Sequence, residues 1–196
     1  MALQQVTSDM LAAGAAVANI GTGGITSNEI LDGTITKSDL ANPLTQGTAQ
    51  NSTSGTSIDF TGIPSWVKRI TVMFNGVSTN GTSIIQIQVG SGSVTTSGYS
   101  GSASFTGATS GATTLTTGIG CGANVSAAYA KYGSMVLTNV NANIWTGFYV
   151  GGITGAAETG IGGGSISLAG TLDRVRITTV NGTDTFDAGS INIMYE

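Results

Sequence analysis

The chain has no histidine, and among its 196 residues there is a single cysteine, Cys121. Without histidine, a Ser–His–Asp triad and a Cys–His nucleophile pair are excluded within one chain. Zinc sites built on histidine are excluded for the same reason. One cysteine can form neither an intrachain disulfide nor a four-cysteine zinc site. The enzyme class that remains open is a glycosidase working with two carboxylates.

The chain has few carboxylates for such a glycosidase, with ten aspartate and glutamate residues in all. Asp184 and Asp187 lie close together beside Asn181-Gly182, where aspartate is ordinarily found because it favours turns. No aspartates recur at the spacing of a calcium-binding loop. We therefore expect no enzymatic activity, no metal and no cofactor. The carboxylate candidates, should that expectation fail, are Asp59, Glu158, Asp173, Asp184 and Asp187.

Charge is scarce, at 8% of residues, and the net charge is −4. The six basic residues form no stripe, so binding of nucleic acid through its phosphates is not expected. They form no polybasic patch for an anionic membrane either. No apolar run approaches the roughly 18 residues of a membrane span. Residues 11–20 are apolar but lack the positive flank of a signal peptide, so we expect synthesis in a reducing cytoplasm.

Glycine is abundant, with 31 residues, whereas proline occurs twice. Glycine, serine and threonine around scattered valine and isoleucine are typical of short strands joined by tight turns. We expect strands within 66–74, 84–89, 135–140, 144–150, 174–180 and 190–195, and short edge strands and loops in 91–128. Turns are expected at Asn75-Gly76, Asn80-Gly81, 160–164 and Asn181-Gly182.

Alternation along two of these strands indicates which side chains face the core. Ile85, Ile87 and Val89 share one face, opposite Gln86 and Gln88. In 174–180, Val175 and Ile177 point inward while Arg174 and Arg176 point outward, within reach of Asp173 or Asp187. Trp145 begins an apolar strand and is expected in the core. The sequence therefore predicts an all-β fold over 58–196, an antiparallel β-sandwich of jelly-roll type.

A short repeat precedes this domain. The phrase ITSNEI at 25–30 recurs as ITKSDL at 35–40, and VTSDM at 6–10 is a looser copy. So short a repeat cannot bury a core within one chain, but several chains wound together can do so. The alternative is a disordered arm with a coincidental likeness. We take 1–44 as an anchor and oligomerisation segment with contacts at Val6, Met10, Ile25, Ile30, Ile35 and Leu40, and 45–57 as a linker.

Two phrases of the larger domain resemble a module of tailed-bacteriophage structural proteins. These are FTGIPSWVKRITVMFNGVS at 60–78 and FDAGSINIMYE at 186–196, whereas 91–165 matches only in composition. The N-terminal repeat is similar to the I-T-x-x-[DE]-L repeats of trimeric phage fibre shafts. The resemblance implies a homotrimer with a jelly-roll head, located in the virion and attached to other virion proteins of the tail or capsid through 1–44.

Three functions remain open at this stage. The first is a short trimeric tail fibre whose head binds a glycan or protein of the host surface. The second is a capsid fibre or decoration protein with no receptor, and the third is a polysaccharide depolymerase. Tyr99, Tyr129 and Tyr132 lie in stretches rich in small residues and are the candidates for receptor contact, because aromatic side chains give a large contact area at little entropic cost.

Overall fold

The computed structural model describes residues 35–36, 39–123 and 125–196, which form fourteen β-strands and no α-helix. The chain divides into two units, 1–43 and 44–196, and each is described by itself. The strands are β1 (Thr45–Gln46), β2 (Gln50–Asn51), β3 (Ser57–Thr61), β4 (Arg69–Thr79), β5 (Ile85–Ser91), β6 (Ser93–Val94), β7 (Ser100–Thr106), β8 (Ser110–Leu115), β9 (Ile119–Gly120), β10 (Ala130–Asn141), β11 (Ile144–Thr154), β12 (Glu158–Ser167), β13 (Arg174–Thr179) and β14 (Phe186–Tyr195).

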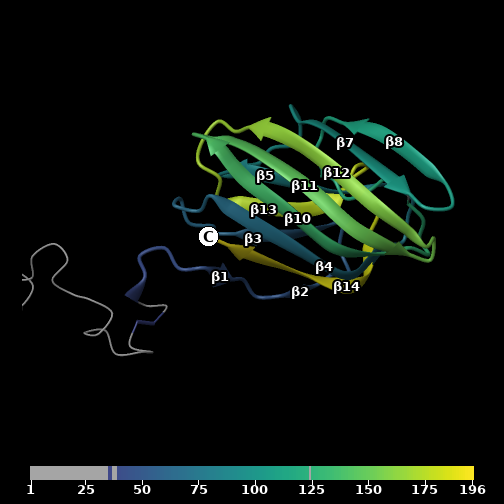
Figure 1. The fold of residues 1–196 in the computed structure, drawn as a ribbon, viewed down its shortest axis with the longest axis horizontal. Helices are drawn as coiled ribbons and strands as arrows, with labels where there is room; N and C mark the ends of the chain where they lie inside the picture. The colour runs from purple at the N-terminus through teal and green to yellow at the C-terminus, as the bar shows by residue number, and fades with distance from the viewer. Residues whose placement is uncertain (1–34, 37–38, 124) are drawn as a thin grey trace, which may run out of the picture. The chain divides into compact units, whose positions relative to one another are not determined.

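The strands of the larger unit form two antiparallel sheets, stacked one behind the other in Figure 1. Sheet A has the order β1-β14-β4-β10-β11-β12-β7-β8, with β2 also paired to β14. Sheet B has the order β3-β13-β5-β6, with β9 also paired to β5. The prediction of an all-β fold built from antiparallel sheets, in a sandwich-like arrangement, is confirmed.

The core lies between the two sheets and follows the expected alternation. Val175 and Ile177 of β13 are fully buried, as are Ile87 of β5 and Leu137 of β10. Trp145 is also a core residue, as expected. Side chains from both sheets belong to one buried apolar cluster, so burial of alternate residues holds the two layers together.

The two phrases that carry the family resemblance are neighbours in space. Most of the first phrase forms β4, and the second forms β14, which pairs antiparallel with β4. Their register places Ile191 opposite Phe74 and Ile193 opposite Val72. On its other side β14 pairs with β1 and β2. The phrases are therefore one structural unit, although more than a hundred residues separate them in the sequence.

The interval expected as a linker, 45–57, belongs to the larger unit instead. Within it β1 and β2 pair with β14, and Ser52 is fully buried. The hydroxyl of Ser52 donates a hydrogen bond of 2.7 Å to the carbonyl of Ala188. The interval has no large apolar side chain, but backbone and hydroxyl hydrogen bonds attach it to the sheet without one.

Two expected turns lie inside strands. Asn75-Gly76 falls within β4 at an irregularity of the β14 pairing, where Gly76 has a φ of 67°. Glycine allows this positive φ, so the pair makes a bulge and not a reversal. Residues 160–164 fall within β12, paired with β11 and β7. The turns at Asn80-Gly81 and Asn181-Gly182 lie between strands, as expected.

In the smaller unit the structure describes 35–36 and 39–43. The carboxylate of Asp39 accepts hydrogen bonds of 2.7 Å from both the backbone N–H and the hydroxyl of Thr36. These bonds hold the pKa of the Asp39 carboxyl below its ordinary value. Ile35 and Leu40 are 59% and 51% exposed. The other expected anchor contacts, Val6, Met10, Ile25 and Ile30, lie outside the described residues.

Candidate functional site

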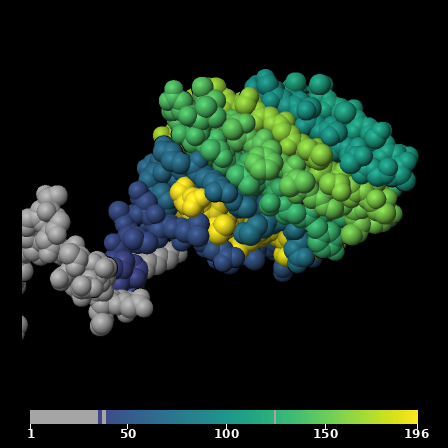
Figure 2. Space-filling view, viewed as in Figure 1, coloured from purple at the N-terminus to yellow at the C-terminus, as the bar shows by residue number. Residues whose placement is uncertain are grey.

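The outward side of strands β10, β11 and β12 carries a group of exposed apolar side chains, which we name the apolar face. They are between 42% and 61% exposed. Figure 2 views the molecule from this side and shows that these strands lie open in the middle of it. The members of the apolar face are Tyr132, Val140, Ile144, Phe148, Val150 and Ile161.

The register of sheet A brings members of the apolar face together. Val150 pairs with Ile161 on β12, and Phe148 pairs with Val136 on β10 and with Gly163 on β12. None of these three strands presents a charged side chain outward, because their charged residues, Lys131 and Glu158, are both buried. The outward surface of these middle strands is therefore uncharged.

The sequence of β11 explains why the surface is unusual. Its inward residues include Trp145, Tyr149 and Ile153, all buried, and its outward residues Phe148 and Val150 are apolar as well. An antiparallel strand with one solvent-exposed face normally alternates apolar and polar residues. A strand that is apolar on both faces is normally covered by other parts of the protein on both. Large exposed apolar patches on soluble proteins mark sites of interaction.

The three tyrosines expected at a receptor surface lie in different environments. Tyr132 is 42% exposed and belongs to the apolar face, and Tyr129 is half-buried. Tyr99 is 3% exposed, which corrects the expectation that it is available for contact. Its hydroxyl accepts a hydrogen bond from the N–H of Val89 and donates to the carbonyl of Thr95. Burial raises the pKa of Tyr99 to about 12.

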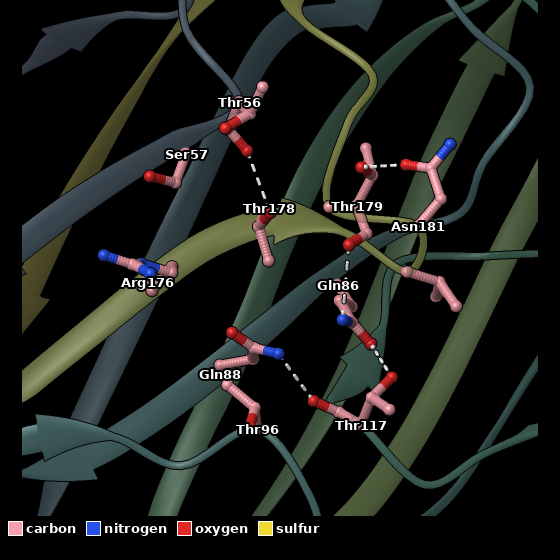
Figure 3. Close-up of a pocket in the computed structure, with 12 residues that line it drawn as sticks. Thr56, Ser57, Gln86, Gln88, Thr96, Thr117, Arg176, Thr178, Thr179 and Asn181 are labelled. Atoms are coloured by element: carbon pink, nitrogen blue, oxygen red, sulfur yellow. Dashed lines mark hydrogen bonds between the residues drawn. The ribbon is translucent and has the colours of Figure 1, made fainter.

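A second surface lies on the outward side of sheet B, where a depression of about 290 Å³ opens to solvent (Figure 3). We name it the polar hollow. Two cross-strand rows from β3, β13 and β5 run along this side of the sheet, and the loop residues Thr96 and Thr117 line the hollow as well. The rows are Ser57–Thr178–Gln86 and Asp59–Arg176–Gln88.

Hydrogen bonds fix the side chains that line the polar hollow. The amide nitrogen of Gln88 donates to the carbonyl of Thr117 at 2.8 Å, and the hydroxyl of Thr117 donates to the amide oxygen of Gln86 at 2.9 Å. The hydroxyl of Thr178 donates to the carbonyl of Thr56 at 2.8 Å. The two glutamines point outward, as the alternation predicted, but Thr117 contributes to covering them, so they are 1% and 6% exposed.

The two arginines beside the hollow are paired with carboxylates. Arg176 donates two hydrogen bonds of 2.7 Å to Asp59, and Arg174 donates two to the neighbouring Asp173. The Arg174 partner was among those expected, whereas the Arg176 partner is Asp59 and not Asp187. These bonds raise the pKa of both guanidinium groups. Two arginines and two aspartates leave this side of sheet B without net charge.

A buried polar cluster lies on the inward side of sheet A. Lys131 of β10 and Glu158 of β12 are 3% and 8% exposed, and both flank Ile153 in one cross-strand row. Cys121, fully buried, interacts electrostatically with Lys131. Burial lowers the pKa of Lys131 to about 8, against the opposing effects of Cys121 and Glu158. Burial raises the pKa of the Cys121 thiol to about 12.

The carboxylates considered for glycosidase chemistry make structural bonds. Asp184 accepts from the N–H of Ser83 at 2.8 Å and from the side-chain amide of Asn181 at 2.6 Å. Asp187 accepts from the hydroxyl of Ser78, and Glu158 accepts from Thr109 at 3.0 Å. Within the described part of the chain, no three His, Cys, Asp or Glu side chains are placed to hold a metal ion. The same residues include no helix able to cross a membrane.

Sequence reasoning missed most of both surfaces. The apolar face had a usable signal, because IWTGFYV at 144–150 is apolar at both odd and even positions. For the polar hollow, alternation predicted that Gln86, Gln88 and Arg176 point outward. No signal indicated loop residue Thr117 or strand β3, because both are distant in sequence from β13. Comparison with protein families, curated proteins and solved structures gives no significant match to this chain.

Proposed function

We propose that this protein is a structural component of a tailed-bacteriophage particle. It is a short homotrimeric tail fibre or appendage, with a jelly-roll head that contacts the host surface and an N-terminal segment, 1–44, that attaches to other virion proteins. The second candidate is a capsid fibre or decoration protein without a receptor. The phage setting rests on the two sequence phrases that resemble phage structural modules.

The observation that carries the assembly part of the proposal is the apolar face. Burial of apolar surface contributes about 25 cal/mol per Å², so leaving Phe148, Val150 and Ile161 in water forgoes several kcal/mol. A second copy of the same chain offers an equally uncharged surface. Contact between two such faces therefore removes no charged group from water. We therefore assign the apolar face to contacts between the heads of one trimer.

Three further features support the proposal. The two resembling phrases form adjacent strands, β4 and β14, as expected if they belong to one inherited module. Ile35 and Leu40, at matched positions of the repeat, are more than half exposed in the single chain and are thus available to other chains. The described carboxylates hold turns and arginines in place, which favours a structural role over a depolymerase.

The first prediction concerns Phe148, which is 56% exposed. Replacing Phe148 by aspartate places a charge in the proposed contact without disturbing the core. We expect the trimer to dissociate at concentrations at least about 100-fold higher than for the unchanged protein, which for a trimer corresponds to about 5.5 kcal/mol in all, or roughly 2 kcal/mol for each of three interfaces. Light scattering across a dilution series, coupled to gel filtration, measures this change.

The matched control is Ser93→Asp, which adds the same charge at an exposed position of β6 in the other sheet. It should leave the mass unchanged, and circular dichroism should show both variants folded. A single-chain mass for the unchanged protein would refute the trimer. A trimer that persists in Phe148→Asp at all dilutions would remove the apolar face from its interface.

Electron microscopy of intact particles separates the two candidate functions. Label directed at this protein should appear on the tail, and purified protein should compete with phage adsorption to host cells. Label on the capsid shell, with no competition at saturating protein, would favour the decoration protein. Absence of label from particles would refute both.

A further inference from the structure

The polar hollow has the properties of a ligand site that the assembly does not use. Its floor and walls are polar, and Val180 is the one apolar side chain larger than glycine among the described residues that line it. Its lining residues come from three strands and four loops, and the hydrogen bonds already described hold five of the side chains. Small ligand sites typically occupy about 300–1,000 Å³, so the hollow, at about 290 Å³, lies just below that range and suits a ligand no larger than a single small ring.

The hollow offers both hydrogen-bond donors and hydrogen-bond acceptors. The side-chain nitrogen of Gln88 is engaged with Thr117, and Figure 3 shows its oxygen turned away from Thr117, where it can accept. The hydroxyl of Ser57 can donate and accept, as can that of the exposed Thr96. Arg176 uses two of its nitrogens on Asp59, which leaves further N–H donors on the third. A ligand that both donates and accepts at closely spaced atoms fits such a lining.

The charge of the lining residues limits which chemical classes of ligand the hollow can bind. Arg176 is the one basic residue in its lining, and the two 2.7 Å hydrogen bonds to Asp59 neutralise it. A phosphate or carboxylate ligand would therefore meet Asp59 as well as Arg176 and gain little. An apolar ligand would leave the lining amides and hydroxyls without partners, which is costly for buried polar groups. Anionic ligands and apolar ligands are therefore both disfavoured.

We infer that the polar hollow binds a neutral, hydroxyl-rich sugar unit of a glycan. Neighbouring hydroxyl groups of a sugar each donate and accept, as the lining requires. Among the described residues that line the hollow, none is aromatic and able to stack on a sugar ring, so each site is weak, with a dissociation constant in the millimolar range, about −4 kcal/mol. That the sugar belongs to a host surface rests on the proposed function, in which three linked sites gain roughly 10²- to 10⁴-fold in avidity.

The test uses the full chain and saturation-transfer NMR with named probes. The neutral probes are glucose, galactose, mannose and N-acetylglucosamine, and the anionic probes are glucuronic acid and inorganic phosphate. At least one neutral sugar should show saturable transfer with a millimolar dissociation constant. The anionic probes should bind at least about 10-fold more weakly than that sugar. No saturable binding of any neutral probe, or stronger binding of an anionic one, would overturn the inference.

A matched pair of variants locates the binding. Thr96→Trp fills the hollow from an exposed loop position, and Ser97→Trp places the same side chain at the next exposed position, outside the lining. Sugar affinity should fall at least about 10-fold in Thr96→Trp and stay within about twofold in Ser97→Trp. Equal affinity in both variants, or an equal loss in both, would refute the hollow as the site.

A smaller substitution tests whether a single lining hydroxyl contributes to sugar binding. Ser57→Ala removes one hydroxyl that makes no hydrogen bond to another described side chain, and it should weaken sugar binding by about twofold to tenfold, since one hydrogen bond contributes about 0.5–1.5 kcal/mol. Unchanged affinity would contradict the proposed contact. These measurements need neither a trimer nor a particle, so failure of the hollow and failure of the phage assignment are separate results.

Discussion

Replacing Gly162 by alanine is expected to lower the free energy of unfolding by about 3–5 kcal/mol, the upper range for a single substitution. Gly162 is buried in β12 of sheet A. A Cβ there would lie 1.8 Å from the carbonyl oxygen and 2.9 Å from the carbonyl carbon of Gly120, in β9 of sheet B. Backbone atoms cannot rotate away as a side chain can. The alanine would therefore force the two sheets apart locally.

The adjacent residue supplies the control. Gly163 points to the other side of β12, where a new Cβ would meet its nearest atom at 3.6 Å, an ordinary contact. Gly163→Ala should change stability by no more than about 1 kcal/mol, with a small gain expected from the less flexible unfolded chain. Thermal unfolding followed by circular dichroism should show Gly162→Ala melting roughly 10 °C lower, and Gly163→Ala within about 4 °C of the unchanged protein. Equal melting temperatures for the two variants would refute this account of the packing.

The same glycines show where sequence reasoning stops. Residues 160–164 contain four glycines, a composition that locally favours a turn. Their role is set by Gly120, which is about forty residues away in sequence and lies across the sandwich. No local pattern distinguishes Gly162, which touches that backbone, from Gly163, which does not. Strand β13, by contrast, was predicted correctly because a period of two is a local property.

The same limit applies to the two surfaces. Alternation correctly placed the glutamines of β5 on the outward side, whereas the two-sided apolar pattern of β11 was a signal for the apolar face that the prediction did not use. The pair of Arg176 and Asp59 joins residues 117 positions apart, and the cover over Gln86 comes from Thr117. Long-range pairings such as these depend on strand order and register. Neither was available from the sequence, since it predicted the sheets without their order.

A second effect on stability is expected at the buried polar cluster. Glu158→Gln keeps an oxygen that can accept from Thr109 but removes the negative charge that favours the buried ammonium of Lys131. Without that charge the buried ammonium is less stable, but a lysine whose pKa is about 8 can lose its proton instead. At pH 7 the free energy of unfolding should therefore fall by about 1 kcal/mol, and by no more than about 1.4 kcal/mol. Urea unfolding curves at fixed pH measure it.

The control is the double variant Lys131→Met with Glu158→Gln, which replaces the ammonium by an apolar side chain of similar length. Removing both charges avoids the cost of burying either, so the double variant should recover most of the loss. If the double variant is no more stable than Glu158→Gln alone, the loss has another origin than the Lys131 charge.

The pH dependence identifies the lysine as the cause. The pKa of Lys131 is about 8 in the folded protein against an ordinary 10.5, so above pH 8 the folded chain gives up a proton that the unfolded chain keeps. Lys131 alone therefore makes stability rise with pH from about 8, by at most about 1.4 kcal/mol per pH unit. From about pH 9 the Cys121 thiol opposes this rise, because its pKa is raised from 9.0 to about 12 and only the unfolded chain ionises there.

The informative interval is therefore below pH 9. Glu158→Gln removes an effect that raises the pKa of Lys131, so its rise in stability should begin at a lower pH than in the unchanged protein. The double variant, which has no lysine at this position, should show no such rise. Parallel stability curves for the three proteins between pH 6 and 9 would show that Lys131 does not titrate with folding, and the buried pair would then have to be explained by packing alone.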